Sequence, residues 1–180
     1  KAVIAEFSGL RGLNPRSQQR TLEIMKKSTN SGSPFFTKRK NVTRKTVPLK
    51  ALVSGDSVAQ YLPEGEWESC AVLGWRGQEG GPKAEDVKQR VVWMFPFGIN
   101  LLELTVYQPM IELAQRFNLV PSWVSMEAVD ERITRMFDSK ASDDLIVCTD
   151  FSRFDQHFNP KMQEAAASIM SALLAPVAES

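Results

Sequence analysis

The segment that most constrains the fold is an apolar, β-branched run that ends on a carboxylate. The run covers residues 145–149 and is followed by Asp150, so it predicts a buried strand at about 144–150 with an acid at its carboxyl end. Ligands of α/β architectures bind at such strand ends. Asp155 follows five residues later, and that spacing puts two side chains on different sides of an unbroken strand or helix. The two carboxylates can serve one site only if the chain turns between them; otherwise they have separate roles.

A turn and a helix are predicted after this strand. Ser152-Arg153 suits the turn, and Asn159-Pro160 is typical of a helix start, with a capping side chain and then proline at the first helical position. Apolar residues at helical spacing continue the helix to about residue 174. Cys148 is expected to point into the buried strand and to be unreactive.

Composition and charge limit the class of protein. The 180 residues carry a net charge of +1 and are 43% hydrophobic, which is enough for a domain with its own core. No run of about 18 apolar residues and no signal-peptide pattern occurs, so we expect neither a membrane segment nor secretion. Cys70 and Cys148 form no paired motif, which argues against a disulfide scaffold or a zinc site. Because the chain lacks an initiator Met, we interpret it as a fragment at both ends.

Positive charge is concentrated in one stretch. Residues 26–50 contain eight Lys or Arg and no acid. Within them a turn-forming cluster at 28–34 precedes Phe35-Phe36 and a basic arm at 38–50. Cations release counterions from phosphates and aromatic rings stack on bases, so this order suits a nucleic acid. A solvated basic loop without a ligand is the simpler explanation of the charges alone.

A second set of cations lies on a predicted strand. Lys88 and Arg90 alternate with apolar residues, which puts both on one face and permits a two-charge anion site. An exposed strand face with ordinary surface charges is the alternative. Residues 70–76 predict another strand, and residues 61–65 predict a turn.

Apolar spacing predicts three further helices. The first starts at Asn14-Pro15 and runs to about Lys27, and the second covers about 100–119 with an interruption or kink at Pro109. Ser125 is the expected cap of the third helix. Five apolar residues of this third helix form one stripe that we assign to the core: Met126, Val129, Ile133, Met136 and Phe137.

The chemistry available to Asp150 depends on its neighbours. A carboxylate at a strand end suits Mg²⁺, which takes one or two acidic ligands and leaves its other positions to water and phosphates. Asp143 and Asp144 begin the strand that Asp150 ends, roughly 20 Å away at about 3.3 Å per residue, so they cannot share an ion with it. We therefore expect Asp150 to supply one ligand of a metal site whose second acidic ligand lies outside this chain. The alternative is that Asp150 caps the end of the strand without binding a metal. His157 is the single histidine, and we assign it a surface role.

Three segments carry short motifs in a fixed order. They are Thr-Asn-Ser-Gly-Ser-Pro at 29–34, Lys-Gln-Arg-Val-Val-Trp-Met-Phe-Pro at 88–96, and an Asp, four residues and an Asp within 150–159. Together they resemble the motif that borders the template path (motif G), the fingertip motif (motif F) and the first palm motif (motif A) of viral RNA-dependent RNA polymerases. The resemblance is strongest to the polymerases of picobirnaviruses, with partitivirus-like enzymes as relatives. The family's Gly-Asp-Asp motif and thumb have no counterpart in this sequence.

The resemblance implies an α+β fold, a right-hand polymerase fragment. Helical, loop-rich fingers would occupy residues 1–140, and residues 141–180 would supply the first strand and helix of an RRM-like palm. Within the fingers we expect the template loop at 28–36, the basic arm at 38–50, the fingertip motif at 83–97 and helices at about 100–138. The resemblance makes Asp150 a ligand of catalytic Mg²⁺ or Mn²⁺, assisted by the backbone carbonyl of Phe151.

The resemblance to these polymerases also implies nucleotide and RNA partners. Lys83, Lys88 and Arg90 would hold the incoming nucleoside triphosphate, and Asp155 would recognise the ribose 2′-hydroxyl, the group that distinguishes RNA precursors. Template and product RNA would contact the loop and the arm, at Ser31, Gly32, Ser33, Pro34, Lys38, Arg39 and Lys40. The complete enzyme would replicate and transcribe the genome of a double-stranded RNA virus, in the virion core or the host cytoplasm. Because the Gly-Asp-Asp motif, the rest of the palm and the thumb are missing, this chain alone is expected to be inactive.

Two other functions fit parts of the sequence. A non-catalytic RNA-binding domain would need only the basic arm, and Asp150→Ala would then have no effect in the complete protein. Its RNA binding would be salt-sensitive and would be lost on neutralising Lys38, Arg39, Lys40, Arg44 and Lys45. A metal phosphohydrolase fits less well, because its nucleophile motif usually has a second Asp two residues on, where this chain has Ser152.

Overall fold

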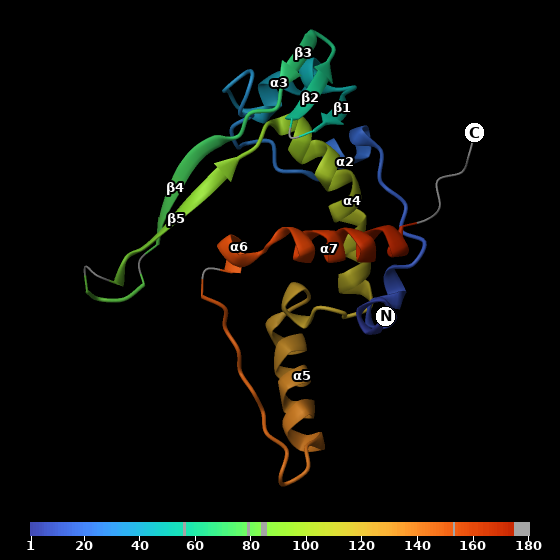
Figure 1. The fold of residues 1–180 in the computed structure, drawn as a ribbon, viewed down its shortest axis with the longest axis vertical. Helices are drawn as coiled ribbons and strands as arrows, with labels where there is room; N and C mark the ends of the chain where they lie inside the picture. Colours follow the sequence, from blue (N-terminus) through green and yellow to red (C-terminus); the bar gives the residue numbers. More distant parts are fainter. Residues whose placement is uncertain (56, 79, 84–85, 153, 175–180) are drawn as a thin grey trace. The chain divides into compact units, whose positions relative to one another are not determined.

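The computed structural model describes residues 1–180 except 56, 79, 84–85, 153 and 175–180, and of residues 78, 88 and 155 it describes the backbone (Figure 1). The chain forms two compact units. The central unit is Arg16–Tyr107, and the terminal unit joins Lys1–Pro15 to Gln108–Ser180. Helices and antiparallel strands are both present, as expected for the α+β class. The division between fingers and palm at residue 140 stays a prediction.

The central unit contains two antiparallel sheets together with helices. Its elements are α2 (Gln18–Ile24), α3 (Arg39–Thr46), β1 (Lys50–Ser54), β2 (Ser57–Leu62), β3 (Gly65–Glu68), β4 (Val72–Gln78), β5 (Lys88–Met94) and the first half of α4 (Phe97–Arg116). Strands β1, β2 and β3 pair in chain order, and the Leu62 to Gly65 pair closes the turn predicted at 61–65. Strands β4 and β5 pair in a long two-stranded ribbon (Figure 1).

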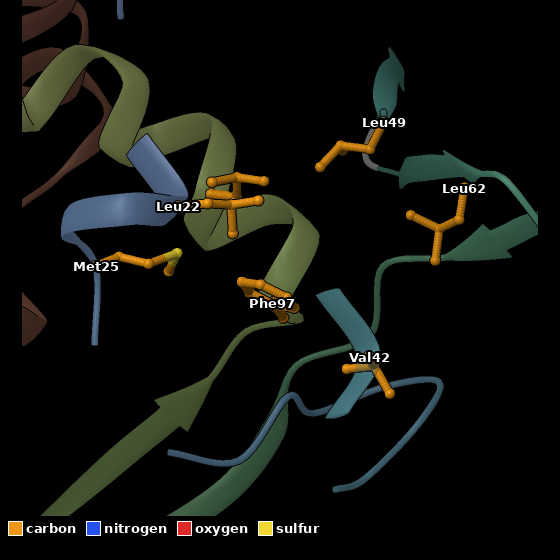
Figure 2. Packing of buried hydrophobic residues seen from close by; sticks show 7 residues of the cluster. Leu22, Met25, Val42, Leu49, Leu62 and Phe97 are labelled. Carbon is orange, nitrogen blue, oxygen red and sulfur yellow. The ribbon is translucent and has the colours of Figure 1, made fainter. Parts of the chain in front are cut away.

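The core of the central unit forms around the first two turns of α4. Phe97 and Leu101 are 2% and 0% exposed and belong to one cluster of buried side chains. The other members come from α2, α3, β2 and the residue before β1 (Figure 2): Leu22, Met25, Val42, Leu49 and Leu62. Removing each such side chain from water contributes about 1.5–3 kcal/mol. The start of α4 is therefore the surface on which the rest of this unit packs.

Helix α4 runs through Pro109 without interruption, so of the two predicted outcomes the interruption is wrong and the kink stays a prediction. Proline has no N–H, and inside a helix it leaves the carbonyl four residues earlier without its usual donor. That carbonyl belongs to Thr105, and it accepts a 2.7 Å hydrogen bond from the backbone N–H of Arg16. The helix continues because a segment distant in sequence satisfies the group that proline leaves unpaired.

Helix α2 begins later than predicted. Its N-cap is Ser17, whose hydroxyl accepts a hydrogen bond from the N–H of Arg20 at 3.2 Å. Asn14, the expected cap, instead donates its side-chain amide to the carbonyl of Gly12 at 3.3 Å. Gly12 has a φ of +78°, so the chain turns before the helix starts and the capping position falls on Ser17.

The terminal unit joins the beginning of the chain to its last described helix. Its elements are α1 (Ala2–Glu6), η1 (Ser8–Leu10), the second half of α4, η3 (Pro121–Trp123), α5 (Met126–Ser139), α6 (Phe154–His157) and α7 (Pro160–Leu173). Leu10, Ala114 and Leu173 form its buried cluster. The carbonyl of Leu173 accepts hydrogen bonds from the N–H groups of Gly12 and Leu13 at 3.0 and 3.2 Å. The N-terminal segment is thus attached to the end of α7 by both apolar and backbone contacts.

Both helix caps predicted in the terminal unit are confirmed. The hydroxyl of Ser125 accepts a hydrogen bond from the N–H of Ala128 at 3.1 Å. The side-chain oxygen of Asn159 accepts one from the N–H of Met162 at 3.2 Å, and Pro160 follows at the first helical position. These caps form as predicted because they depend on residues within one helical turn.

The apolar stripe of α5 is exposed, which differs from its assignment to the core. Met126 is 74% exposed, and Ile133, Met136 and Phe137 are exposed as well. None of these side chains belongs to a buried cluster of the described residues. Helical spacing identifies an apolar face, but it does not identify the surface that covers it.

Residues 144–150 form no strand, which also differs from the prediction. A strand requires a neighbour that exchanges backbone hydrogen bonds with it, and no strand of the described residues pairs with this segment. Cys148 is accordingly exposed rather than buried. The turn predicted at Ser152-Arg153 cannot be compared in full, because Arg153 lies outside the described residues.

Gly98 tests how tightly the start of α4 is packed. A Cβ at this position would lie 2.7 Å from Oε1 of Gln60, whose side chain is fully buried. Alanine favours a helix by about 1 kcal/mol over glycine, whereas overpacking a core costs about 1–3 kcal/mol. We expect Gly98→Ala to lower the free energy of unfolding measured by urea denaturation. In a Gln60→Ala background the same change should cost less, and an equal cost in both backgrounds would contradict the clash.

Candidate functional site

The loop that resembles the template-path motif is fixed to the start of α4. The N–H of Phe97 donates to the carbonyl of Ser31 at 2.7 Å, and the N–H of Ser31 donates to the carbonyl of Thr37 at 2.7 Å. Gly32 has a φ of +61°, and a Cβ there would lie 3.4 Å from the carbonyl oxygen of Phe95. Glycine therefore suits this position both for its backbone conformation and for the close approach of the two segments.

The four predicted RNA contacts of this loop are not equally accessible. Ser31 is 0% exposed, and its hydroxyl accepts a hydrogen bond from the N–H of Thr37 at 3.2 Å. Gly32 is also buried, whereas Ser33 and Pro34 are half-buried. The side chain of Ser31 thus holds the loop in shape, and Ser33 and Pro34 are the members that a ligand can reach.

The predicted basic arm is a helix over most of its length. Helix α3 buries Val42 and Thr46, one turn apart, in the core of the central unit. Lys45 pairs with Glu64 at 3.1 Å. The exposed cations of the arm are Lys38, Lys40, Arg44, Lys45 and Lys50, and the ion pairs found among the described residues join none of Lys38, Lys40 and Arg44 to an acid. The arm is therefore an amphipathic helix with a basic outer face, a different arrangement from a solvated loop.

Arg39 connects this helix to the loop and to α4. Its Nε donates to the carbonyl of Asn30 at 3.2 Å, and its Nη2 donates to Oδ1 of Asn100 at 2.8 Å. The guanidinium also lies over the ring of Phe97, 5.6 Å from its centre. Burial lowers the pKa of Arg39 from its ordinary value, but arginine stays charged at neutral pH. Arg39, predicted as an RNA contact, therefore first of all holds three segments together.

A cavity of about 460 Å³ opens beside Arg39 within the central unit. The loop, the start of β4, the end of β5, and the starts of α3 and α4 contribute to its wall. Its surface is mainly apolar and includes Phe36, Trp93 and Phe95, and the polar groups of its wall include Asn30, Arg39 and Asn100.

The β4–β5 hairpin places a second arginine, Arg76, opposite Arg90, which was predicted from the sequence to hold the triphosphate. Arg90 on β5 is the direct partner of Arg76 on β4, and Lys88 is the partner of Gln78. Directly opposed residues of antiparallel strands share a face of the sheet, so the two arginines lie on one face. Both are exposed, and no ion pair found among the described residues joins either one to an acid. Two neighbouring positive charges on one face of a sheet attract anions.

The two lysines assigned to the triphosphate lie at and near the start of β5. Lys83 is exposed in the loop between the strands, and its N–H donates to the carboxylate of Asp86 at 3.1 Å. The backbone of Lys88 lies in β5, two residues before Arg90. The strand predicted for Lys88 and Arg90 is confirmed, and the role of the two lysines stays a prediction.

Asp150 presents an accessible carboxylate. It is exposed, and its Oδ1 accepts a 2.9 Å hydrogen bond from the N–H of Phe151. Asp155 lies in the short helix α6. The carboxylate of Asp144 accepts a hydrogen bond from the N–H of Ala141 at 2.8 Å, within a turn of its own. No three acidic, cysteine or histidine side chains gather among the described residues, so the described residues offer one open carboxylate here rather than a complete metal site.

Aromatic rings support the segment that follows Asp150. The ring centres of Phe151 and Phe154 are 5.8 Å apart, and those of Phe154 and Phe158 are 5.7 Å apart. Tilted ring pairs at such distances are favourable. His157 in the same helix is exposed, in keeping with the surface role assigned to it.

Comparison with known proteins decides the family. A family model described as viral RNA-dependent RNA polymerase matches residues 1–178. The chain belongs to the viral RNA-dependent RNA polymerases. The resemblance inferred from three short motifs is therefore confirmed across nearly the whole sequence.

Relatives of this polymerase chain come from human picobirnavirus. It is 57% identical over 173 residues to a potential RNA-dependent RNA polymerase of Human picobirnavirus (strain Human/Thailand/Hy005102/-). It is 56% identical to the human picobirnavirus polymerase in two crystal structures. TM-scores are 0.93 for one and 0.88 for the other, a mutant that lacks an insertion loop. The matches cover 96–98% of this chain but only 32–35% of the relatives, so the chain spans about a third of their length.

Among the described residues of the polymerase chain, no helix is both long enough and apolar enough to cross a membrane.

Arg76 was not among the residues predicted from the sequence, because the alternation of cations along β5 carries no information about β4. The signal that finds it is the pairing register of the two strands, which a hairpin fixes through its connecting loop.

Arg39 offers a test of how the loop is held. Lysine keeps the charge but cannot reproduce the two directed hydrogen bonds of the guanidinium. We expect Arg39→Lys to lower the free energy of unfolding by about 1–3 kcal/mol, since hydrogen bonds to charged groups are worth that much. Hydrogen exchange at the N–H groups of Ser31 and Phe97 should also become faster. Arg44→Lys, at an exposed site of the same helix, is the control, and equal effects of the two changes would contradict the role given to Arg39.

Proposed function

We propose that, in the complete polymerase, this chain binds the template and the incoming nucleoside triphosphate and supplies one catalytic carboxylate for RNA synthesis. The observation that carries the proposal is the match of the polymerase family model to residues 1–178. The three motifs occur within that match in the order template path, fingertip and first palm motif. The reaction is the transfer of a nucleotide to the 3′-oxygen of the growing strand with loss of pyrophosphate.

Asp150 is the proposed metal ligand. Its exposed carboxylate has one oxygen hydrogen-bonded to the N–H of Phe151, so oxygen ligands of the kind that Mg²⁺ or Mn²⁺ prefers remain available. The backbone carbonyl of Phe151 is the second oxygen ligand proposed here. Bound divalent ions would activate the attacking oxygen and stabilise the leaving pyrophosphate. Further acidic ligands are proposed to come from the rest of the polymerase.

The β4–β5 hairpin is the proposed triphosphate-binding element. Arg90 and Arg76 are opposed on one face, and guanidinium groups bind phosphate oxygens through two parallel hydrogen bonds. Lys88 and Lys83 add positive charge along the same strand and its connecting loop. Asp155, five residues after Asp150, is proposed to accept a hydrogen bond from the ribose 2′-hydroxyl.

The basic face of α3 is the proposed contact for the RNA backbone. Lys38, Lys40 and Arg44 are exposed on or beside this helix, and each phosphate that they neutralise releases counterions. Ser33 and Pro34 of the loop that precedes this helix are half-buried and are proposed to contact the same strand. A template guided along this face would be copied in the virion core or the host cytoplasm, where we expect the enzyme to act.

The metal role of Asp150 is tested in the complete polymerase. Asp150→Asn keeps the size of the side chain but removes the charge, and we expect nucleotide incorporation to fall at least about 100-fold while RNA binding persists. Asp143→Asn, seven residues earlier, is the control and should retain activity. Wild-type incorporation by Asp150→Asn would overturn the proposal and favour a binding domain without chemistry. Residues 1–180 alone should show no incorporation.

The anion site of the hairpin is tested by the nucleotide dependence of the reaction. Arg76→Gln and Arg90→Gln should each raise the KM for nucleoside triphosphates about tenfold, since each removes a charge-assisted contact to phosphate. Lys50→Gln, an exposed cation on β1 of the other sheet, serves as the control. If only Arg90→Gln raises the KM, Arg76 has no part in the site.

A further inference from the structure

The cavity beside Arg39 has been given no ligand so far, although Gly32 and Arg39 in its wall are predicted RNA contacts. It encloses about 460 Å³, which lies within the roughly 300–1,000 Å³ of small-molecule sites. All the segments that line it belong to the central unit. They come from the loop after α2, the starts of α3 and α4, and the start of β4 and end of β5 where the ribbon meets α4.

Three aromatic residues at this cavity are exposed to solvent. Trp93 is 61% exposed, Phe36 is 59% exposed, and Phe95 is exposed as well. Phe36 also has a φ of +47°, a left-handed conformation that residues other than glycine rarely adopt. A bulky aromatic residue at such a position, with its ring left in solvent, gains little from folding, and this points to a role in binding.

The polar groups of the cavity are mainly hydrogen-bond donors. Oδ1 of Asn30 accepts a hydrogen bond from the N–H of Gly32 at 2.7 Å, and Oδ1 of Asn100 accepts one from Arg39. The oxygens of both amides are therefore engaged within the fold. Nδ2 of Asn30 and Nη1 of Arg39 donate in none of the hydrogen bonds found among the described residues. Such donors match the carbonyl oxygens of a base edge.

The charge around the cavity indicates what kind of ligand carries that base. Lys38 and Lys40 flank Arg39 and are exposed, and residues 26–50 contain eight cations and no acid. A polyanion with flat apolar groups satisfies both the rings and the charges. Bases inside a duplex are stacked on each other and cannot enter a pocket, whereas unpaired bases can stack on aromatic side chains.

We propose that this cavity binds one unpaired nucleobase of the template strand, stacked on Trp93 and Phe36, while Lys38 and Lys40 contact the flanking phosphates. The donors of Asn30 and Arg39 favour the bases that carry a carbonyl group, which are guanine, uracil and cytosine, over adenine. The inference rests on the proposed function in that a polymerase presents single-stranded template to this surface. It adds a specific stacking site to the general template path, and this site holds the strand in register before copying.

The test measures binding of a short single-stranded oligouridylate by the complete polymerase. Trp93→Leu and Phe36→Leu keep an apolar side chain but remove the aromatic face, and each should weaken binding about 5- to 100-fold. Trp93→Phe, which keeps a ring, should bind more tightly than Trp93→Leu. Trp75→Leu is the matched control, because Trp75 is 81% exposed on the same ribbon but does not line the cavity. Oligoadenylate should bind more weakly than oligouridylate to the wild type.

A second readout locates the base directly. Single-stranded RNA with one 5-iodouridine should form photocrosslinks to Trp93 or Phe36, identified by mass spectrometry of the digested complex. Wild-type affinity of both leucine variants, or crosslinks that all lie elsewhere, would overturn the stacking site. The proposed function fails separately: in that case Asp150→Asn would retain incorporation. Loss of binding in the leucine variants together with an active Asp150→Asn would leave an RNA site on a chain without the catalytic role.

Discussion

The central unit depends on the burial of the first two turns of α4. Phe97 and Leu101 are almost completely removed from water, and side chains from α2, α3 and β2 pack on them. The same turn holds the loop through the hydrogen bond from the N–H of Phe97 to Ser31. Apolar burial is not directional, whereas this backbone bond and the fork of Arg39 are. Burial therefore brings the segments together, and the polar contacts fix how the loop lies on the helix.

This arrangement separates residues that shape the site from residues that face a ligand. Ser31, Gly32 and Arg39 lie in a run that resembles nucleic-acid-binding sequence, yet their groups are largely committed to the fold. The rings of Phe36 and Trp93 and the amines of Lys38 and Lys40 project outward instead. Internal contacts already set the conformation of this loop, so the RNA contact that we propose would require little further ordering of it.

Sequence reasoning succeeded where the signal was local. The caps at Ser125 and Asn159, the turn at 61–65 and the strand that contains Arg90 all follow from residues within a few positions of each other. It failed where a distant partner decides the outcome. Pro109 does not break α4 because Arg16 donates to the freed carbonyl of the helix. The stripe of α5 and the run at 144–150 are apolar in pattern, but no described segment covers or pairs with them.

The sequence by itself determined the family, the order of the three motifs, the acid at position 150 and the concentration of positive charge in residues 26–50. These properties are carried by residue type and spacing along the chain, so folding does not alter them. Only the tertiary structure decided that Arg76 opposes Arg90, that Arg39 is a structural connector, and that Phe36 and Trp93 line one cavity. Each of these depends on strand register or on packing between segments tens of residues apart, and spacing along one segment cannot specify contacts with another.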